Sequence, residues 1–154
     1  MTSALDYNVD QMSEMFLKLS GQIIYRWNSC GKICKFSQRT LPKIGYSDYL
    51  KRLLLYSDCS IQCYAIVIIY LDRFTNKNEH LWLDQASLYT LTLVLLVISI
   101  KFWDDQKYAN KYFAKLGGVS LRLLNELELE VLELMNYDLF IQEDLIFRYM
   151  KYFS

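Results

Sequence analysis

Two charged side chains stand where the surrounding pattern expects apolar ones. Lys101 ends a long apolar run, and Glu128 lies among the leucines of a later segment. At about 100° per residue, Glu128 projects between Leu124 and Leu132 on the apolar side of a helix. Removing a charge from water costs free energy unless the charge is paired or hydrogen-bonded. Lys101 and Glu128 are therefore expected to form charge-assisted bonds, with each other within the core or toward a protein that docks there.

Asp72 is a third charge in apolar surroundings. In the helix expected from Ser60 to Thr75 it projects among Ile61, Ala65 and Ile68. We expect it to be a structural buried charge with a partner. Lys51 or Arg52 could supply that partner, and the sequence does not decide between them.

The cysteines form two pairs with three residues between their members: Cys30 and Cys34, then Cys59 and Cys63. Structural zinc sites more commonly have two intervening residues or include histidines. The one histidine, His80, belongs to no acid–base constellation. We expect reduced thiols, partly packed in the core, and no metal. A nucleophile–base pair, a phosphate-binding loop and a cofactor motif are also lacking, so we expect neither an enzyme nor a cofactor.

The composition favours one helical domain. The chain has 154 residues, 53% of them hydrophobic, with one proline and five glycines, so long helices joined by short turns are expected. The formal net charge is zero and no basic stripe is visible, which argues against nucleic acid and anionic membranes as partners. The polar, acidic N-terminus differs from a secretory signal, so we expect a cytoplasmic or nuclear location, or both.

The apolar run from Ala86 to Ile100 predicts the central helix of the fold. It is shorter than the roughly 20 residues that cross a membrane, and it contains serines and threonines. A helix that is apolar all round otherwise lies at the centre of a helical globule. We expect this core helix to run from about Asp84 to Trp103.

Other periodicities predict the helices that wrap the core helix. Ser60 and Ser120 are candidate N-caps, as is Asn110 for a short helix that ends at Gly117 and Gly118. The expected helices run from about Val9 to Trp27, Ser47 to Tyr56, Ser60 to Thr75, Asn110 to Gly117, Ser120 to Met135 and Gln142 to Phe153. The pattern indicates a compact all-α bundle.

Four segments in order resemble a known family. They are YSDYLKRLLLY at Tyr46–Tyr56, IYLDRF at Ile69–Phe74, SIKFWDDQKYAN at Ser99–Asn110, and KYFAKLGGVS followed by NELELEVLELMNYDL. Together they span about two thirds of the chain, and their combination is more specific than any one piece. The chain resembles a single cyclin box of the P-type (U-type) class, which includes the yeast phosphate-pathway cyclin.

The resemblance implies a five-helix cyclin box over residues 42–141. Residues 1–41 would be an N-terminal helix and basic connector packed on the box, and residues 142–154 a short C-terminal helix. The implied partner is the catalytic subunit of a cyclin-dependent kinase, which this chain would bind and activate as a regulatory subunit. The residues that match the kinase-binding positions are Lys101, Phe102, Asp105, Glu128, Leu132, Tyr137 and Leu139. In cyclin boxes the matching lysine and glutamate face the kinase helix that swings inward for activity.

Two departures from the family bear on its role. The arginine that pairs with the aspartate matching Asp72 in many cell-cycle cyclins has no clear match here, and the hydrophobic-patch motif of the first helix is absent. Too little chain follows Ile141 for a second box, so we expect a single one. The alternative function is a cyclin-like helical adaptor that binds nucleic acid or transcription machinery, which the neutral charge disfavours.

Overall fold

The computed structural model describes residues 10, 14–18, 21, 32–33, 43–78, 81–82, 85–105 and 108–151. The elements in order are β1 (Lys32–Ile33), α2 (Tyr46–Tyr56), α3 (Gln62–Lys77), β2 (Leu81–Trp82), α4 (Gln85–Trp103), α5 (Asn110–Gly117), α6 (Leu121–Leu134) and α7 (Glu143–Met150). The prediction of an all-α fold is confirmed, with α2 to α6 as the five helices of the box and α7 as the short C-terminal helix.

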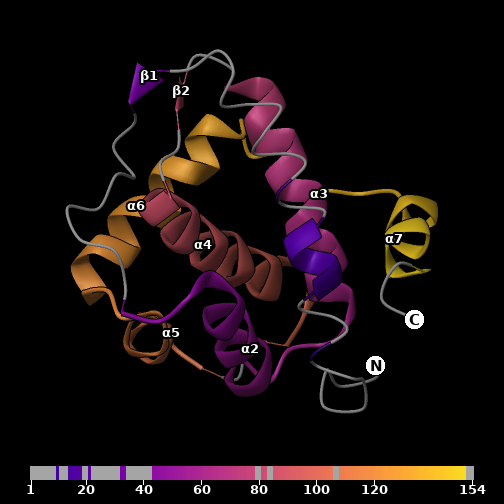
Figure 1. Cartoon of the computed structure of the whole chain (residues 1–154). Coiled ribbons are helices and arrows are strands. Elements are labelled where there is room, and N and C mark those ends of the chain that lie inside the picture. The colour runs from indigo at the N-terminus through magenta and orange to yellow at the C-terminus, as the bar shows by residue number, and fades with distance from the viewer. Residues whose placement is uncertain are drawn as a thin grey trace.

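Helix α4 forms the centre of the box (Figure 1). Its apolar residues from Leu91 to Val97 have almost no exposed surface, and Ser87 and Ser99 are equally buried. Two buried hydroxyl groups of α4 are accommodated because they bond to their own helix. Thr92 Oγ1 donates to the Leu88 carbonyl at 2.7 Å and Ser99 Oγ to the Leu96 carbonyl at 2.8 Å.

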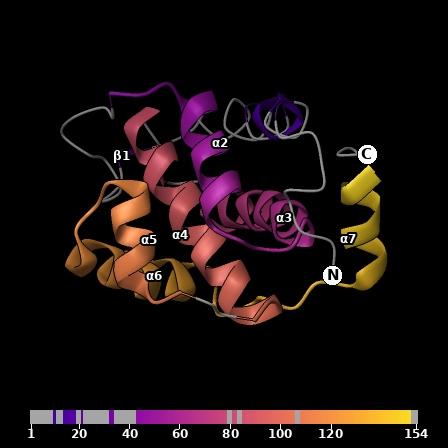
Figure 2. The same ribbon diagram turned by 90° about the horizontal axis from the view of Figure 1, so that it is seen from below.

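Four helices contact α4 and cover it from different sides. Helices α2, α3, α5 and α6 each pack against it, and α7 packs on the far side of α3. In the view of Figure 2, α5 and α6 lie on one side of α4 and α3 and α7 on the other. An all-round apolar helix requires such wrapping, so the arrangement follows from the composition of α4. Among the described residues, no helix has both the length and the apolar character needed to cross a bilayer.

A two-residue parallel ladder lies outside the helical box. Lys32 of β1 is opposite Leu81 of β2, and Ile33 is opposite Trp82. The ladder joins the segment before the box to the connection between α3 and α4. This ladder was not predicted, because two residues are too few to show an alternating pattern.

The helix ends agree with the sequence analysis at some positions and differ at others. Ser120 caps α6, since its Oγ accepts from the Leu123 backbone amide at 3.1 Å, and Gly118 ends α5 with a φ of 69°. The predicted caps Ser60 and Asn110 are wrong. The cap position of α3 is Ile61, and Asn110 is already the first residue of α5. The backbone amide of Ser60 instead donates to Asp104 Oδ2 at 2.8 Å, so a carboxylate 44 residues away neutralises the start of α3.

The N-terminal segment reaches the core through Phe16. Residues 14–18 are helical, and Phe16 is 2% exposed. It adjoins apolar side chains of three helices: Leu50, Leu53 and Leu54 of α2, Tyr64 and Val67 of α3, and Leu96 of α4. Lys51 of α2 is paired with Asp10 at 2.8 Å. These contacts support the proposal that residues 1–41 pack on the box, although most of the segment, including Met12, Leu19 and Ile23, lies outside the described residues.

Substituting Gly117 by alanine should destabilise the fold, because α5 crosses α4 closely at this glycine. A Cβ there would lie 2.2 Å from Leu93 Cδ2, and Leu93 is itself fully buried. We expect Gly117→Ala to lower the free energy of unfolding by about 1–3 kcal/mol, measured by urea denaturation. Gly45→Ala is the control, since no atom lies within 4 Å of its added Cβ. Equal stability of the two variants would contradict the close approach of α4 and α5.

Substituting Phe16 by alanine should be more costly than most single changes in the box. A buried phenylalanine truncated to alanine typically costs about 3–5 kcal/mol. Thermal unfolding of Phe16→Ala would measure the loss, with Leu129→Ala as the control because Leu129 is 54% exposed. A Phe16→Ala variant as stable as the control would show that the N-terminal segment is not part of the folded unit.

Candidate functional site

Lys101 and Glu128 form an ion pair between the last turn of α4 and the middle of α6. Lys101 Nζ donates to Glu128 Oε1 at 2.7 Å and to Oε2 at 3.0 Å. The Glu128 side chain is 14% exposed and that of Lys101 31%. The expectation that each satisfies the other is confirmed. Lys101 requires a partner because it lies in the last turn of α4, at the edge of the apolar core and beside α6.

Asn110 adds a third hydrogen bond to the Glu128 carboxylate. Its Nδ2 donates to Glu128 Oε2 at 2.8 Å and to Asn125 Oδ1 at 2.8 Å. The other atom of the same amide, Oδ1, is buried without a hydrogen-bond partner in the described part of the chain. The network fixes the carboxylate between α4, α5 and α6 and leaves it little freedom. Asn110 and Asn125 both lie in the family-like segments of the sequence, but the hydrogen bonds of Asn110 to Glu128 and to Asn125 were not predicted.

An aromatic cluster continues the site from the end of α4 to the loop after α6. The Phe102 and Trp103 rings meet edge to face at 5.2 Å, and Trp103 stacks on Phe140 at 6.0 Å between ring centres. Trp103 Nε1 donates to Tyr70 Oη at 2.7 Å, and this hydroxyl donates to the Leu139 carbonyl at 2.8 Å. Burial raises the pKa of Tyr70, which keeps its hydroxyl protonated as a donor.

The loop that follows α6 is tied to α3 by two cations. Arg73 donates to the Asp138 and Phe140 carbonyls, at 3.3 and 2.8 Å. Lys77 Nζ donates to the Met135 carbonyl and to Asp138 Oδ2, both at 3.0 Å. The Lys77 ammonium holds the pKa of Asp138 below its usual value. Asn136 and Tyr137 adopt left-handed backbone angles, with φ of 54° and 55°.

The result is a charged pair with exposed apolar side chains around it. Phe102 is 50% exposed, Tyr137 57% and Phe140 62%, while Leu132 and Leu139 are partly exposed. We call Lys101, Phe102, Glu128, Leu132, Tyr137, Leu139 and Phe140 the Glu128 surface. Exposed aromatic side chains held by a rigid frame are typical of protein-binding surfaces.

The structure therefore brings six of the seven predicted kinase-binding residues into one connected region. The seventh, Asp105, lies exposed just after α4. Phe140, Asn110 and the ties from Arg73 and Lys77 were not predicted. The sequence shows an aromatic residue at position 140, but nothing in the local pattern distinguished it from a core residue.

Asp72 is not the buried charge that its helical projection predicted. It is partly exposed, and Asn76 Nδ2 lies 3.5 Å from its Oδ2. Lys51 instead pairs with Asp10. The projection was misleading because α3 turns this side toward solvent near its C-terminal end, where the apolar covering stops.

Two of the four cysteines lie within the described residues. Cys59 and Cys63 are free and buried near Asp104, Ser57 and Tyr64. Among the described residues, no group of three or more histidine, cysteine, aspartate or glutamate side chains could hold a metal ion. Cys30 and Cys34 lie outside this part of the chain.

Comparison with known proteins places these features in a family. The family model described as "Cyclin" matches residues 11–139. Cyclin-U4-3 of Arabidopsis thaliana is 34% identical over 137 residues, which cover 89% of this chain and 59% of the relative. Cyclin-U4-2 of Arabidopsis thaliana is 39% identical, covering 66% and 47% of the two chains, and cyclin-P4-1 of Oryza sativa subsp. japonica is 36% identical, covering 70% and 50%.

The chain spans about half to three fifths of the length of these relatives. The family match covers most of the chain and includes all five box helices, α2 to α6. With its helical box and its relatives among the plant U-type and P-type cyclins, the chain belongs to the cyclin family.

Proposed function

We propose that this chain is a regulatory subunit that binds and activates a cyclin-dependent protein kinase, and that the Glu128 surface is where the kinase docks. Cyclins are regulatory rather than catalytic proteins, and the match to the cyclin family model supports the proposal. The observation that carries it is the ion pair of Lys101 and Glu128, shielded at its base and surrounded by exposed Phe102 and Tyr137.

The chemistry of this surface suits the recognition of a helix. Lys101 and Asn110 already satisfy the Glu128 carboxylate in part, so the carboxylate is oriented before binding occurs. The Glu128 carboxylate can accept further hydrogen bonds from main-chain N–H groups of a docked segment. The Lys101 ammonium can donate to its main-chain carbonyls. The apolar side chains around the pair supply the area whose burial provides affinity.

Activation follows from differential binding. A partner that contacts the kinase better in one conformation shifts the kinase toward that conformation by the difference in binding free energy. The Glu128 surface is held rigidly by α4, α6 and the tied loop, so it is suited to select a kinase conformation rather than adapt to several.

The purified chain should transfer no phosphate by itself and should raise the activity of its kinase. Affinity purification from native extract followed by mass spectrometry would identify the kinase. Its activity toward a peptide substrate would then be measured with and without this chain. Phosphate transfer by the chain alone would contradict the proposal, as would a bound kinase whose activity does not change.

Glu128→Ala should weaken binding to that kinase by about 100-fold, because it leaves the partly shielded Lys101 ammonium unpaired. Lys101→Ala should weaken it to a similar degree. The double variant should lose less than the product of the two effects, since contacting residues are not additive. Isothermal titration calorimetry measures each affinity, and circular dichroism verifies that each variant is folded.

Glu133→Ala is the matched control for this series. Glu133 is on the same helix and is exposed, whereas Glu130 is partly buried and is therefore a poorer control. We expect Glu133→Ala to bind like the parent chain. If folded Glu128→Ala bound like the parent while Glu133→Ala did not, the kinase would dock on a different face of α6.

A further inference from the structure

Two buried thiols are neighbours at the point where the chain passes from α2 to α3. Cys59 lies in the connection and Cys63 in the first turn of α3, and both are free. Each thiol makes the largest contribution to the pKa shift of the other, so the two side chains interact directly. The Glu128 surface uses neither of them. The pair therefore has no part in the site described above, although it carries the most reactive side-chain group in proteins.

Hydroxyl groups adjoin the sulfur of Cys59. Ser57 Oγ lies 3.3 Å from Cys59 Sγ, and Tyr64 Oη lies 3.2 Å from it. A hydroxyl can turn its proton toward a negatively charged sulfur, so both groups can stabilise a Cys59 thiolate. The hydrogen bond with Cys63 lowers the pKa of the Cys59 thiol; the two hydroxyls act in the same direction, and burial opposes them. Cys59 is therefore the nucleophile of the pair.

Cys63 keeps its proton and directs it at a carboxylate. Cys63 Sγ donates to Asp104 Oδ2 at 3.8 Å. Its hydrogen bond with Cys59 and its burial raise the pKa of the Cys63 thiol. The same oxygen of Asp104 accepts from the Ser60 backbone amide at 2.8 Å. Since Asp104 directly follows α4, one carboxylate joins the thiol pair and the start of α3 to the end of the central helix.

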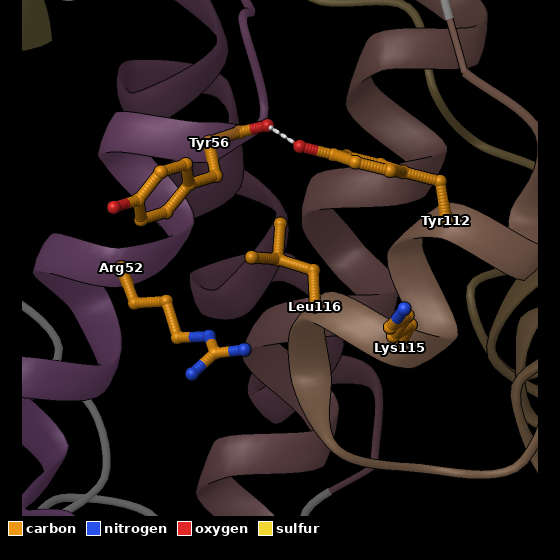
Figure 3. A pocket seen from close by; sticks show the side chains of 5 residues that line it. All are labelled: Arg52, Tyr56, Tyr112, Lys115 and Leu116. Atoms are coloured by element: carbon orange, nitrogen blue, oxygen red, sulfur yellow. Dashed lines mark hydrogen bonds between the residues drawn. The ribbon is translucent and has the colours of Figure 1, made fainter.

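The connection between α2 and α3 can open without the unfolding of either helix. Its start is fixed by Tyr112 of α5, whose hydroxyl donates to the Tyr56 carbonyl at the end of α2 (Figure 3). Its end is fixed by the amide of Ser60 on Asp104. Between these anchors Asp58 has a φ of 51°, a left-handed angle that few residues with a side chain adopt. Local opening of residues 57–59 gives a small oxidant access to sulfurs that are shielded in the closed form.

We propose that Cys59 and Cys63 are a reversible oxidation site for peroxides, and that their disulfide loosens the link between α3 and the end of α4. The Cys59 thiolate attacks a peroxide oxygen, the O–O bond breaks, and Cys59 becomes a sulfenic acid while the departing hydroxide is protonated to water. The Cys63 sulfur then attacks the Cys59 sulfur and displaces a second hydroxide, which leaves as water. Asp104 is placed to accept the Cys63 proton. Overall, two thiols lose two protons and two electrons, and one hydrogen peroxide becomes two molecules of water.

The disulfide affects α4 through Asp104. In the reduced chain this carboxylate accepts from the Cys63 thiol and from the Ser60 amide. A disulfide has no S–H group, so oxidation removes the first of these hydrogen bonds. Asp104 follows Lys101 and Phe102 within one helical turn, so a looser Asp104 alters the edge of the Glu128 surface. An effect on kinase binding rests on the proposed function, whereas the disulfide does not and is measured without a kinase.

The test treats the folded chain with hydrogen peroxide, alkylates the remaining thiols and maps the peptides by mass spectrometry. It is run on the parent chain and on Cys30→Ser/Cys34→Ser, in which Cys59 and Cys63 are the two cysteines left. We expect the peptide that holds both to lose two hydrogens, to take up no alkyl group and to be restored by dithiothreitol. Amide hydrogen exchange of the oxidised chain should become faster at residues 103–105 and stay unchanged at residues 124–131.

Two single variants in the same background separate the roles of the thiols. Cys63→Ala should stop at the Cys59 sulfenic acid, which dimedone labels, whereas Cys59→Ala should lose this labelling. The proposal is overturned if peroxide leaves both thiols open to alkylation, if the disulfides formed join separate chains alone, or if dimedone labels the two variants equally. A disulfide between Cys59 and Cys63 that leaves exchange at residues 103–105 unchanged would overturn the link to α4.

Discussion

The burial of α4 along residues 89–100 is the constraint on which the rest of this structure depends. A helix with almost no polar side requires apolar neighbours in every direction, and α2, α3, α5 and α6 provide them. The hydroxyls of Thr92 and Ser99 are compatible with that burial because they bond to the helix's own carbonyls. Close contact also sets the residue types of the neighbours, as Gly117 of α5 against Leu93 demonstrates.

The end of that buried helix determines where the candidate site forms. Lys101 is the first cation after the long apolar run, and it emerges beside α6 at the position of Glu128. Trp103, two residues later, connects the same turn to Tyr70 and Phe140. Phe102 and Phe140 are therefore attached, through Trp103, to the end of the buried helix α4. A binding surface of this kind loses little conformational freedom when a partner docks.

Local patterns in the sequence predicted the features that depend on neighbours along the chain. The limits of α4, the Ser120 cap and the left-handed Gly118 all follow from periodicity and residue type within one or two turns. The misplaced charges at Lys101 and Glu128 predicted their pairing because each had an unmet need and the opposite sign.

Features that join distant segments were not predictable in the same way. Asp104 at the start of α3, the amide of Asn110 on Glu128 and the Arg73 tie to the loop after α6 link residues 18 to 67 positions apart. Nothing in a local window indicates which helix end a given aspartate will face. Asp72 was wrongly predicted to be buried. A helical projection identifies the side of a helix on which a residue lies, but not where neighbouring elements stop covering that side.

The central claim is that the Glu128 surface, rather than another face of the box, contacts the kinase. Hydrogen–deuterium exchange of the chain with and without its kinase tests this claim most directly, because protection is read along the whole backbone. The account predicts slower exchange at residues 101–105, 128–132 and 136–140 in the complex, and unchanged exchange at residues 52–56. Protection confined to α2 and α7, with residues 128–132 unaffected, would contradict it.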